Sequence, residues 1–139
     1  MAIQQNPVQY AKAIQYQMQS IVTPVPVYNS FNRNFATQPQ FVVTNLRNVH
    51  QPVYTGQTQG NKGIDRPTFQ ISIYTQVIED GFTISNTILQ SLHGYSGLFG
   101  GATYGFWVAK ADVFWLYNSY NNEDKLAEVF LDCTLDIPT

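Results

Sequence analysis

The chain is poor in residues that bind metals or form covalent cross-links. Its 139 residues include one cysteine, Cys133, and two histidines, His50 and His93. A single cysteine excludes an internal disulfide and any zinc site built from several cysteines. The two histidines lie far apart in the sequence and lack the short spacing of a metal-binding pair. The sequence therefore predicts no disulfide, no metal site and no cofactor.

Common sequence signatures of catalysis are missing as well. No GxSxG motif marks a nucleophilic serine. The glycine cluster at Gly97, Gly100 and Gly101 follows a predicted helix, whereas a phosphate-binding loop leads into the N-terminus of one. Asp132 and Asp136 share a strand face but would lie roughly 13 Å apart, too far for paired acid–base work on one bond. We therefore expect no enzymatic activity, although residues distant in sequence can converge in a fold.

Charge is scarce, and long apolar runs are absent. Charged residues make up 12% of the chain, about half of the usual fraction of roughly 25%. The pI of about 5.5 and the lack of a Lys/Arg cluster argue against sequence-specific nucleic-acid binding. A stacking platform of Phe106, Trp107, Phe114 and Trp115 is the alternative. No stretch approaches the roughly 18 apolar residues of a membrane span, and no signal peptide is evident. We expect a soluble, intracellular protein without a membrane partner.

Uncharged amides and aromatic rings take the place of charge. Gln and Asn are dense along the first sixty residues, and the chain holds nine Tyr, nine Phe and two Trp. Aromatics are enriched at the centres of interfaces, so we expect some of them to face a neighbour. The charges that exist are unevenly spread. Residues 1–78 carry five basic side chains against Asp65 alone, and residues 79–139 carry eight acids against two lysines. If this split survives folding as two patches, it favours head-to-tail contacts between copies.

The periodicity of the first half predicts one helix and three strands. Asn6 and Pro7 are a helix start, and apolar residues recur at spacings of three and four from there to Ile21. The prolines of the 23–26 segment end this helix, and residues 25–28 form a short edge strand. Strands follow over 41–49 and 66–77, joined by a flexible, glycine-punctuated hairpin loop at about 50–65. The inward faces are predicted to hold Phe41, Val43, Leu46, Phe69, Ile71 and Ile73.

The second half predicts a helix and two long strands. Asp80 or Thr83 caps the helix, its apolar face carries Ile84, Ile88 and Leu92, and it ends before Gly94. A long aromatic strand runs from 102 to 117, with Gly105 and Lys110 as the alternative positions of a bulge. A polar turn then leads to a final strand over 126–137, with Cys133 on its apolar face. The predicted fold is a single α+β domain over 1–139. It is a two-layer sandwich with a mainly antiparallel sheet and two amphipathic helices packed on one face.

Residues 66–101, RPTFQISIYTQVIEDGFTISNTILQSLHGYSGLFGG, resemble the centre of the tail terminator, or tail completion, proteins of long-tailed bacteriophages. In that group a strand leads through a short break to a helix. The helix ends near a Leu-His/Asn-Gly signal, and a loop rich in Leu and Gly and then long strands follow. The segment from Pro24 to Tyr28 also resembles the sequence that the group places after its first helix. The length of the 50–65 loop and the amide-rich surface depart from the group.

The resemblance implies a virion structural protein of the tail or neck, assembled in the host cytoplasm. Such a protein forms a homo-oligomeric ring, a hexamer, at the head-proximal end of the tail. The ring ends tube polymerisation and joins the tail to the head. Its partners would be other copies of itself, the tail tube protein and a head connector or stopper protein, with a lumen through which DNA can pass.

Two sets of residues are candidates for contacts. A partner-binding or lumen-lining role is predicted for the loop residues Gln57, Thr58, Gln59, Asn61 and Lys62. Inter-subunit ion pairs are predicted from Arg47, Arg66, Glu123, Asp124 and Asp132. Two alternatives remain open for the function. One is another neck or tail-tube component of the same virion, and the other is a ligand-binding module that uses the aromatic segment Tyr104 to Tyr117.

Overall fold

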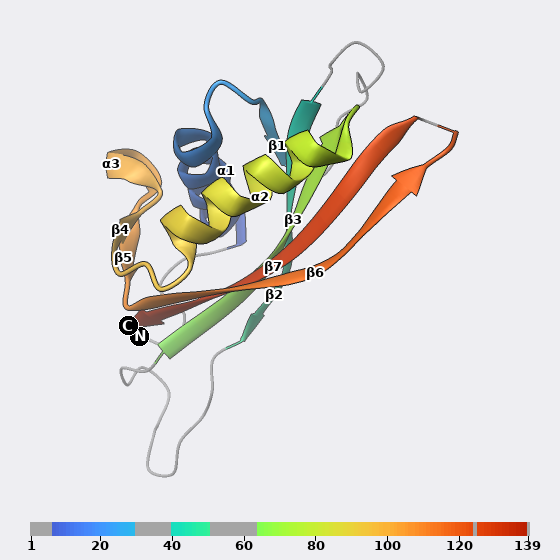
Figure 1. The fold of residues 1–139 in the computed structure, drawn as a ribbon. Helices are drawn as coiled ribbons and strands as arrows, with labels where there is room; N and C mark the ends of the chain where they lie inside the picture. The colour runs from blue at the N-terminus through green and yellow to red at the C-terminus, as the bar shows by residue number, and fades with distance from the viewer. Residues whose placement is uncertain (1–6, 30–39, 51–63, 124, 139) are drawn as a thin grey trace.

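A computed structural model gives the fold of residues 7–29, 40–50, 64–123 and 125–138 (Figure 1). The helices are α1 (Pro7–Val22), α2 (Ile78–Leu92) and α3 (Gly101–Tyr104). The strands are β1 (Val27–Asn29), β2 (Gln40–His50), β3 (Ile64–Thr75), β4 (Gly97–Phe99), β5 (Phe106–Val108), β6 (Lys110–Asn121) and β7 (Leu126–Pro138). The chain is thus α+β, as predicted.

The main sheet has five strands in the order β1-β2-β3-β7-β6, and β4 and β5 form a separate two-stranded hairpin. All neighbours in the main sheet are antiparallel except β1, which runs parallel to β2. β1 is an edge strand, as predicted, and its parallel pairing with β2 makes the sheet mixed. The last strand, β7, lies between β3 and β6, so β6 joins the sheet only through its pairing with β7.

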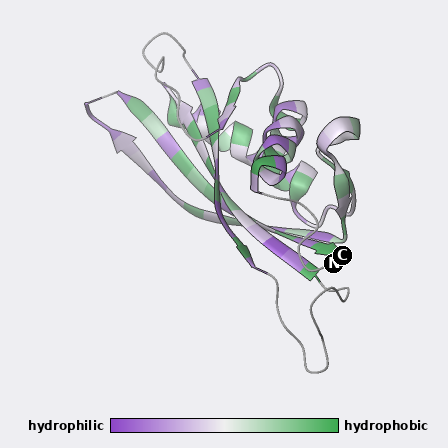
Figure 2. Ribbon diagram, turned by 180° about the vertical axis from the view of Figure 1, so that it is seen from behind, coloured by the Kyte–Doolittle hydropathy of each residue, from purple (hydrophilic) through white to green (hydrophobic). Residues whose placement is uncertain are grey.

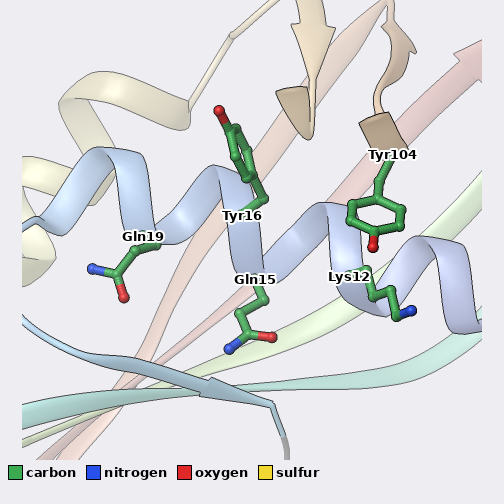
Figure 3. Close-up of a pocket in the computed structure, with 5 residues that line it drawn as sticks. All are labelled: Lys12, Gln15, Tyr16, Gln19 and Tyr104. Atoms are coloured by element: carbon green, nitrogen blue, oxygen red, sulfur yellow. The ribbon is translucent and has the colours of Figure 1, made fainter. Parts of the chain in front are cut away.

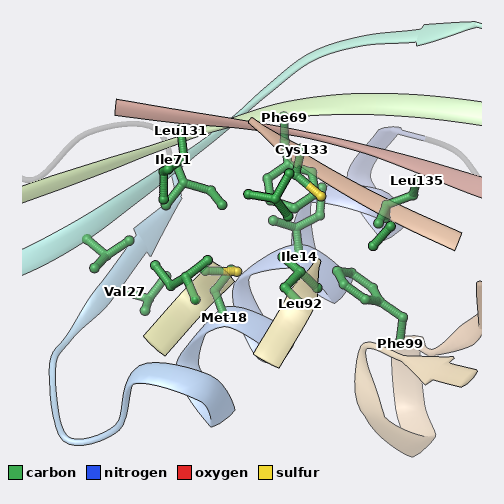
Figure 4. Packing of buried hydrophobic residues seen from close by; sticks show 14 of the residues in the cluster. Ile14, Met18, Val27, Phe69, Ile71, Leu92, Phe99, Leu131, Cys133 and Leu135 are labelled. Carbon is green, nitrogen blue, oxygen red and sulfur yellow. The ribbon is translucent and has the colours of Figure 1, made fainter. Parts of the chain in front are cut away.

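The main core lies between the sheet and α1 and α2, which pack on the same side of it (Figures 1 and 4). Strand β3 contributes Phe69, Ile71 and Ile73, all fully buried as predicted. Strand β7 contributes its odd-numbered residues from Val129 to Ile137. Among them is Cys133, which is buried as predicted, and that burial raises the pKa of its thiol. Hydrophobic and hydrophilic residues alternate along these strands in Figure 2.

The predicted inward face of β2 is wrong. Val42 packs into the main core, whereas Phe41 and Val43 lie on the opposite side in a small second cluster with Leu126. Leu46 packs against the main core, because residues of equal parity to Val42 share its face. The prediction placed Phe41, Val43 and Leu46 on one face because all three are apolar. The strand in fact buries apolar residues on both faces.

The starts of both long helices follow local chemistry. Pro7 opens α1 as predicted, because its fixed φ suits the first helical position. Helix α2 begins earlier than predicted, at Ile78, and its N-cap residue Val77 makes no side-chain cap. Asp80 therefore lies in the first turn, where a carboxylate favours the helix dipole. The helix ends at Leu92, and Gly94 follows with a φ of 78°, as expected of a glycine beyond a helix C-terminus.

The predicted strand over 102–117 is the largest error. The segment contains α3, β5 and the first part of β6 in place of one strand. Gly100 and Gly101 have φ values of 97° and 78°, a region that L side chains avoid. A Cβ on Gly105 would lie 1.9 Å from the carbonyl oxygen of Gly101. These glycines therefore let the chain reverse tightly. The described chain has a third helix, α3, in addition to the two that were predicted.

Candidate functional site: exposed apolar surfaces at two ends of the molecule

The loop singled out from the sequence lies outside the described residues. His50 is the last residue of β2 and Ile64 the first of β3. The structure therefore places neither Gln57 nor Lys62, nor the residues between them. A role for this loop in contacting a partner or lining a lumen stays a prediction.

Most of the charges singled out from the sequence lie on the sheet face that carries no helix. There Arg47 pairs with Asp132 at 2.5 Å, and Arg66 pairs with Asp136 at 3.1 Å. Lys110 also approaches Asp136, at 3.7 Å. These are contacts within one subunit, so Arg47, Arg66 and Asp132 already have partners before any neighbour arrives. Their predicted inter-subunit role remains untested.

The acidic residues of the β6–β7 turn are placed only in part. Glu123 is exposed in this turn, and Asp124 lies outside the described residues. The backbone N–H of Glu123 donates to the side chain of Asn121, which shapes the turn. Glu123 is thus positioned at the tip of a long hairpin, where a neighbouring molecule can reach it.

Strand β6 carries the most extensive exposed apolar surface of the described chain. The β6 surface is defined here by five side chains that are 42–55% exposed: Phe114, Trp115, Leu116, Tyr117 and Tyr120. They point to both faces of the sheet, because Trp115 and Tyr120 lie on the helix side with Leu131 and Ala127, and Phe114 and Tyr117 lie opposite with Asp132 and Phe130. A β-bulge at Leu116 shifts the register between Trp115 and Tyr117.

The edge of β6 is closed over its first part only. The backbone N–H of Ala111 donates to the carbonyl of Tyr95, and that of Gly94 donates to the carbonyl of Ala111. The N–H of Val113 donates to Nδ1 of His93. The segment after α2 thus covers the edge as far as Val113. From Phe114 to Tyr120, within the part of the chain that the structure describes, only β7 pairs with β6.

Two aromatic contacts anchor the β6 surface. Trp115 packs against Phe82 of α2, with ring centroids 6.4 Å apart. Tyr117 packs against Phe130 of β7 at 4.7 Å. The hairpin of β6 and β7 extends beyond the helices (Figure 1), so these rings gain support from one side and remain open on the other.

Tyr117 is also the exposed end of a row of rings that crosses the whole sheet. On the helix-free face, successive ring centroids are 4.7–6.4 Å apart along the series Tyr117, Phe130, Tyr74, Phe41 and Tyr28. These residues come from β6, β7, β3, β2 and β1 in the order of the sheet. Cross-strand aromatic pairs of this kind stabilise a sheet by roughly 0.2–1 kcal/mol each. The row links the β6 edge to the other four strands of the sheet through ring contacts.

A second apolar surface lies on the β4–β5 hairpin. Leu98 and Trp107 face each other across the two strands and are 53% and 60% exposed, whereas Phe99 and Phe106 point inward and are buried. A Cβ on Gly105 would meet Leu98 at 3.1 Å, so the Leu98 side chain covers the turn that follows α3.

Helix α1 extends this second surface. A Cβ on Gly101 would lie 2.5 Å from the ring of Tyr16, which is 56% exposed. Tyr16, Tyr104 and Lys12 line a shallow hollow with Gln15 and Gln19 (Figure 3). The Lys12 Nζ lies 5.2 Å from the centroid of the Tyr104 ring, a cation–π contact. The α1–hairpin surface is defined here as Tyr16, Leu98, Tyr104 and Trp107 with Lys12 at its rim.

One buried polar contact escaped the sequence reasoning. The hydroxyl of Tyr10 on α1 donates to Oδ2 of Asp65 on β3 at 2.6 Å, and both residues are fully buried. Burial, the hydrogen bond and the charge of Asp65 raise the pKa of Tyr10 well above its usual value. Tyr10 lies four residues before Ile14, a helical spacing that would have placed it on the apolar face. The pair ties the helix layer to the start of β3.

Metal and membrane features can be stated for the described residues only. Over residues 7–29, 40–50, 64–123 and 125–138, no three His, Cys, Asp or Glu side chains gather closely enough to hold a metal ion. Within those same ranges, no helix has the length and hydrophobicity to cross a membrane. His93 accepts a hydrogen bond from the backbone of Val113, which gives it a structural role.

Comparisons with known proteins place the fold. No protein-family profile matches the sequence, and no curated protein matches it. A chain from the virion of a native gene transfer agent particle superposes with a TM-score of 0.60 at 11% sequence identity, over 95% of each chain. A chain from a structure of an extracellular contractile injection system, described as the PVC sheath/tube terminator in the extended state, gives a TM-score of 0.52 at 8% identity.

The second match covers 99% of this chain and 58% of the other. At these identities the likeness concerns the fold. The fold of this chain is therefore shared with a component of a virion particle and with a chain from a sheath/tube terminator structure. The predicted resemblance to tail terminators is confirmed at that level.

Proposed function

We propose that this chain is a tail terminator of a phage-like particle. In this role it is a virion structural protein that forms a ring at the head-proximal end of the tail. The ring ends polymerisation of the tail tube and joins the tail to the head connector or stopper. It acts through surfaces and carries out no catalysis, and it assembles in the host cytoplasm before it enters the virion.

The observation that carries this proposal is the shared fold over nearly the whole chain. The alignment with the structure described as a sheath/tube terminator spans 99% of this chain, so the likeness extends over the whole domain. The two exposed apolar surfaces agree with an assembling protein. Large apolar patches on a soluble protein mark interaction sites, and the sparse charge gives little protection against association.

A neighbouring possibility is another neck or tail-tube component. The gene transfer agent match supports it equally, because that description names the particle and not the part. The ligand-binding alternative has less support. Trp115 packs on Phe82, and neither Trp115 nor Trp107 lines the hollow beside Tyr104.

The experiment combines deletion of the gene with analysis of the pure protein. We expect deletion to give tails of irregular length that carry no heads, with rescue by the intact gene. Mass photometry of the pure protein should show one closed oligomer, a hexamer, and negative-stain images should show single rings. Long cylinders would assign the chain to the tube. A strict monomer at high concentration, together with normal tails after deletion, would refute the proposal.

A further inference from the structure

The β6 surface and the α1–hairpin surface lie at opposite ends of the molecule (Figure 1). The hairpin of β4 and β5, with α3, forms one end, and the projecting hairpin of β6 and β7 forms the other. The two surfaces share no residue, so a single copy can use both at once. Two distinct patches, one at each end, are what a head-to-tail contact requires, whereas a two-fold dimer needs only one self-complementary patch.

The size of the β6 surface suits a stable protein interface. Each of its large side chains has a total area of about 150–250 Å², and each is about half exposed. Together they present about 500 Å² of largely apolar surface, divided between the two faces of the sheet edge, so that a neighbour docked on the edge contacts both parts. A standard interface buries about 800 Å² on each partner. The β6 surface therefore supplies more than half of one side, and the open strand edge adds backbone groups that a neighbour can bind.

The charges around the two surfaces are complementary. Glu79 and Asp80 are exposed in the first turn of α2, beside the Phe82 that contacts Trp115. Glu123 lies at the tip of the β6–β7 hairpin, where Lys125 offsets part of its charge. The α1–hairpin surface carries a single positive charge, because Lys12 is the sole charged residue of α1 and the 97–107 segment has none. Positive and negative rims of this kind orient an encounter between copies.

We propose that the β6 surface of one copy docks on the α1–hairpin surface of the next copy. Repeated around an axis, this heterologous contact closes into the ring. The inference rests on the proposed function, since it names the surfaces through which the ring forms. The molecule that docks on each surface is a second copy of this chain, because the matching apolar surface and the opposite charge both lie on the same molecule.

The test uses one charged substitution in each surface. Leu116→Glu places a carboxylate in the β6 surface, and Trp107→Glu places one in the α1–hairpin surface. Both side chains are 42–60% exposed, so the isolated subunit should fold normally, as circular dichroism can verify. Gln90→Glu, on the solvent side of α2, is the matched control. Leu116→Ser and Trp107→Ser repeat the test with a milder change if either glutamate variant proves unstable.

Mass photometry of each variant and of mixtures gives the decisive result. Each interface variant alone should remain monomeric at a concentration where the wild type and Gln90→Glu are rings. An equimolar mixture of Leu116→Glu and Trp107→Glu should give a 1:1 heterodimer that grows no further. The reason is that one copy supplies an intact α1–hairpin surface and the other an intact β6 surface.

The possible failures are distinguishable. Rings from both interface variants would overturn this inference and leave the ring itself standing. If such rings also lose binding to the tail tube protein, the occupant is the tube and not a second copy. A mixture that stays monomeric refutes the pairing of these two surfaces. A wild type that never assembles contradicts the proposed function.

Discussion

Replacing Tyr10 with Phe tests the buried contact between the helix layer and the sheet. The Tyr10 hydroxyl donates to Oδ2 of Asp65 at 2.6 Å, and neither residue is exposed. A hydrogen bond to a charged group stabilises a fold by about 1.5–3 kcal/mol. The substitution keeps the ring and its edge-on contact with Phe106. We therefore expect Tyr10→Phe to lower the free energy of unfolding by about 2 kcal/mol at pH 7, a fall in Tm of about 6 °C.

The pH dependence sharpens this prediction. The folded-state pKa of Tyr10 is raised by burial and by Asp65, so folding favours the protonated phenol. That stabilisation is complete below the unfolded pKa of about 10 and is lost as the pH rises above it, by about 1.4 kcal/mol for each pH unit. The difference in unfolding free energy between wild type and Tyr10→Phe should therefore be constant up to about pH 9 and then shrink. Other groups that titrate in this range, including Cys133, cancel in the difference.

Denaturant unfolding at pH 7, 9, 10.5 and 11, followed by circular dichroism at equal protein concentration, measures this difference. Tyr16→Phe is the matched control, since Tyr16 is a tyrosine of the same helix that is 56% exposed. It should change stability by less than about 0.5 kcal/mol. A difference between wild type and Tyr10→Phe that does not shrink from pH 9 to pH 11 would refute the reasoning. Equal stability of the two proteins at pH 7 would do so as well.

Two further predictions concern the tight turn and the charged face. Gly105→Ala should destabilise the fold more than Gly94→Ala, because its Cβ would lie 1.9 Å from a backbone oxygen, whereas nothing lies within 4 Å of a Cβ on Gly94. Gly94→Ala should lower the free energy of unfolding by about 1–2 kcal/mol through its positive φ alone. Thermal melts of the two variants compare the losses, and equal losses would contradict the close approach at Gly105. Asp136→Asn should lower stability by at most about 1 kcal/mol, because its partners Arg66 and Lys110 are partly exposed. The loss should fall as salt is added, and a salt-independent loss in the same melts would mean that charge is not the cause.

Local periodicity was enough to predict the elements whose two faces differ. Phe69, Ile71 and Ile73 alternate with polar residues, and all three are buried. Ile84, Ile88 and Leu92 recur at helical spacing and line the buried side of α2. In each case one face of the element packs on the core and the other does not, so the spacing of apolar residues predicts both the element and its buried face.

The pattern fails where neighbouring residues are apolar on both faces. Phe114 to Tyr117 are four consecutive apolar or aromatic residues, a run typical of a buried strand. The structure exposes them because β6 lies at the edge of the sheet and its hairpin with β7 extends beyond the helices (Figure 1). The strand order depends on β7, which pairs with the distant strand β3, so a short stretch of sequence around β6 cannot predict it. The same applies to Arg47 and Asp132, whose pairing across the sheet is set by register.

The uneven pairing along the β6 edge agrees with the proposed docking of a second copy. A long apolar edge strand exposes unpaired backbone groups and risks uncontrolled association. The molecule closes this edge as far as Val113 with its own segment after α2. It leaves the more aromatic remainder open, interrupted by the bulge at Leu116 that restricts which strands can pair there. A protein that acted alone would gain stability and solubility by closing the whole edge. An edge that is closed over its first part and open over its aromatic part is therefore what the proposed contact between copies requires.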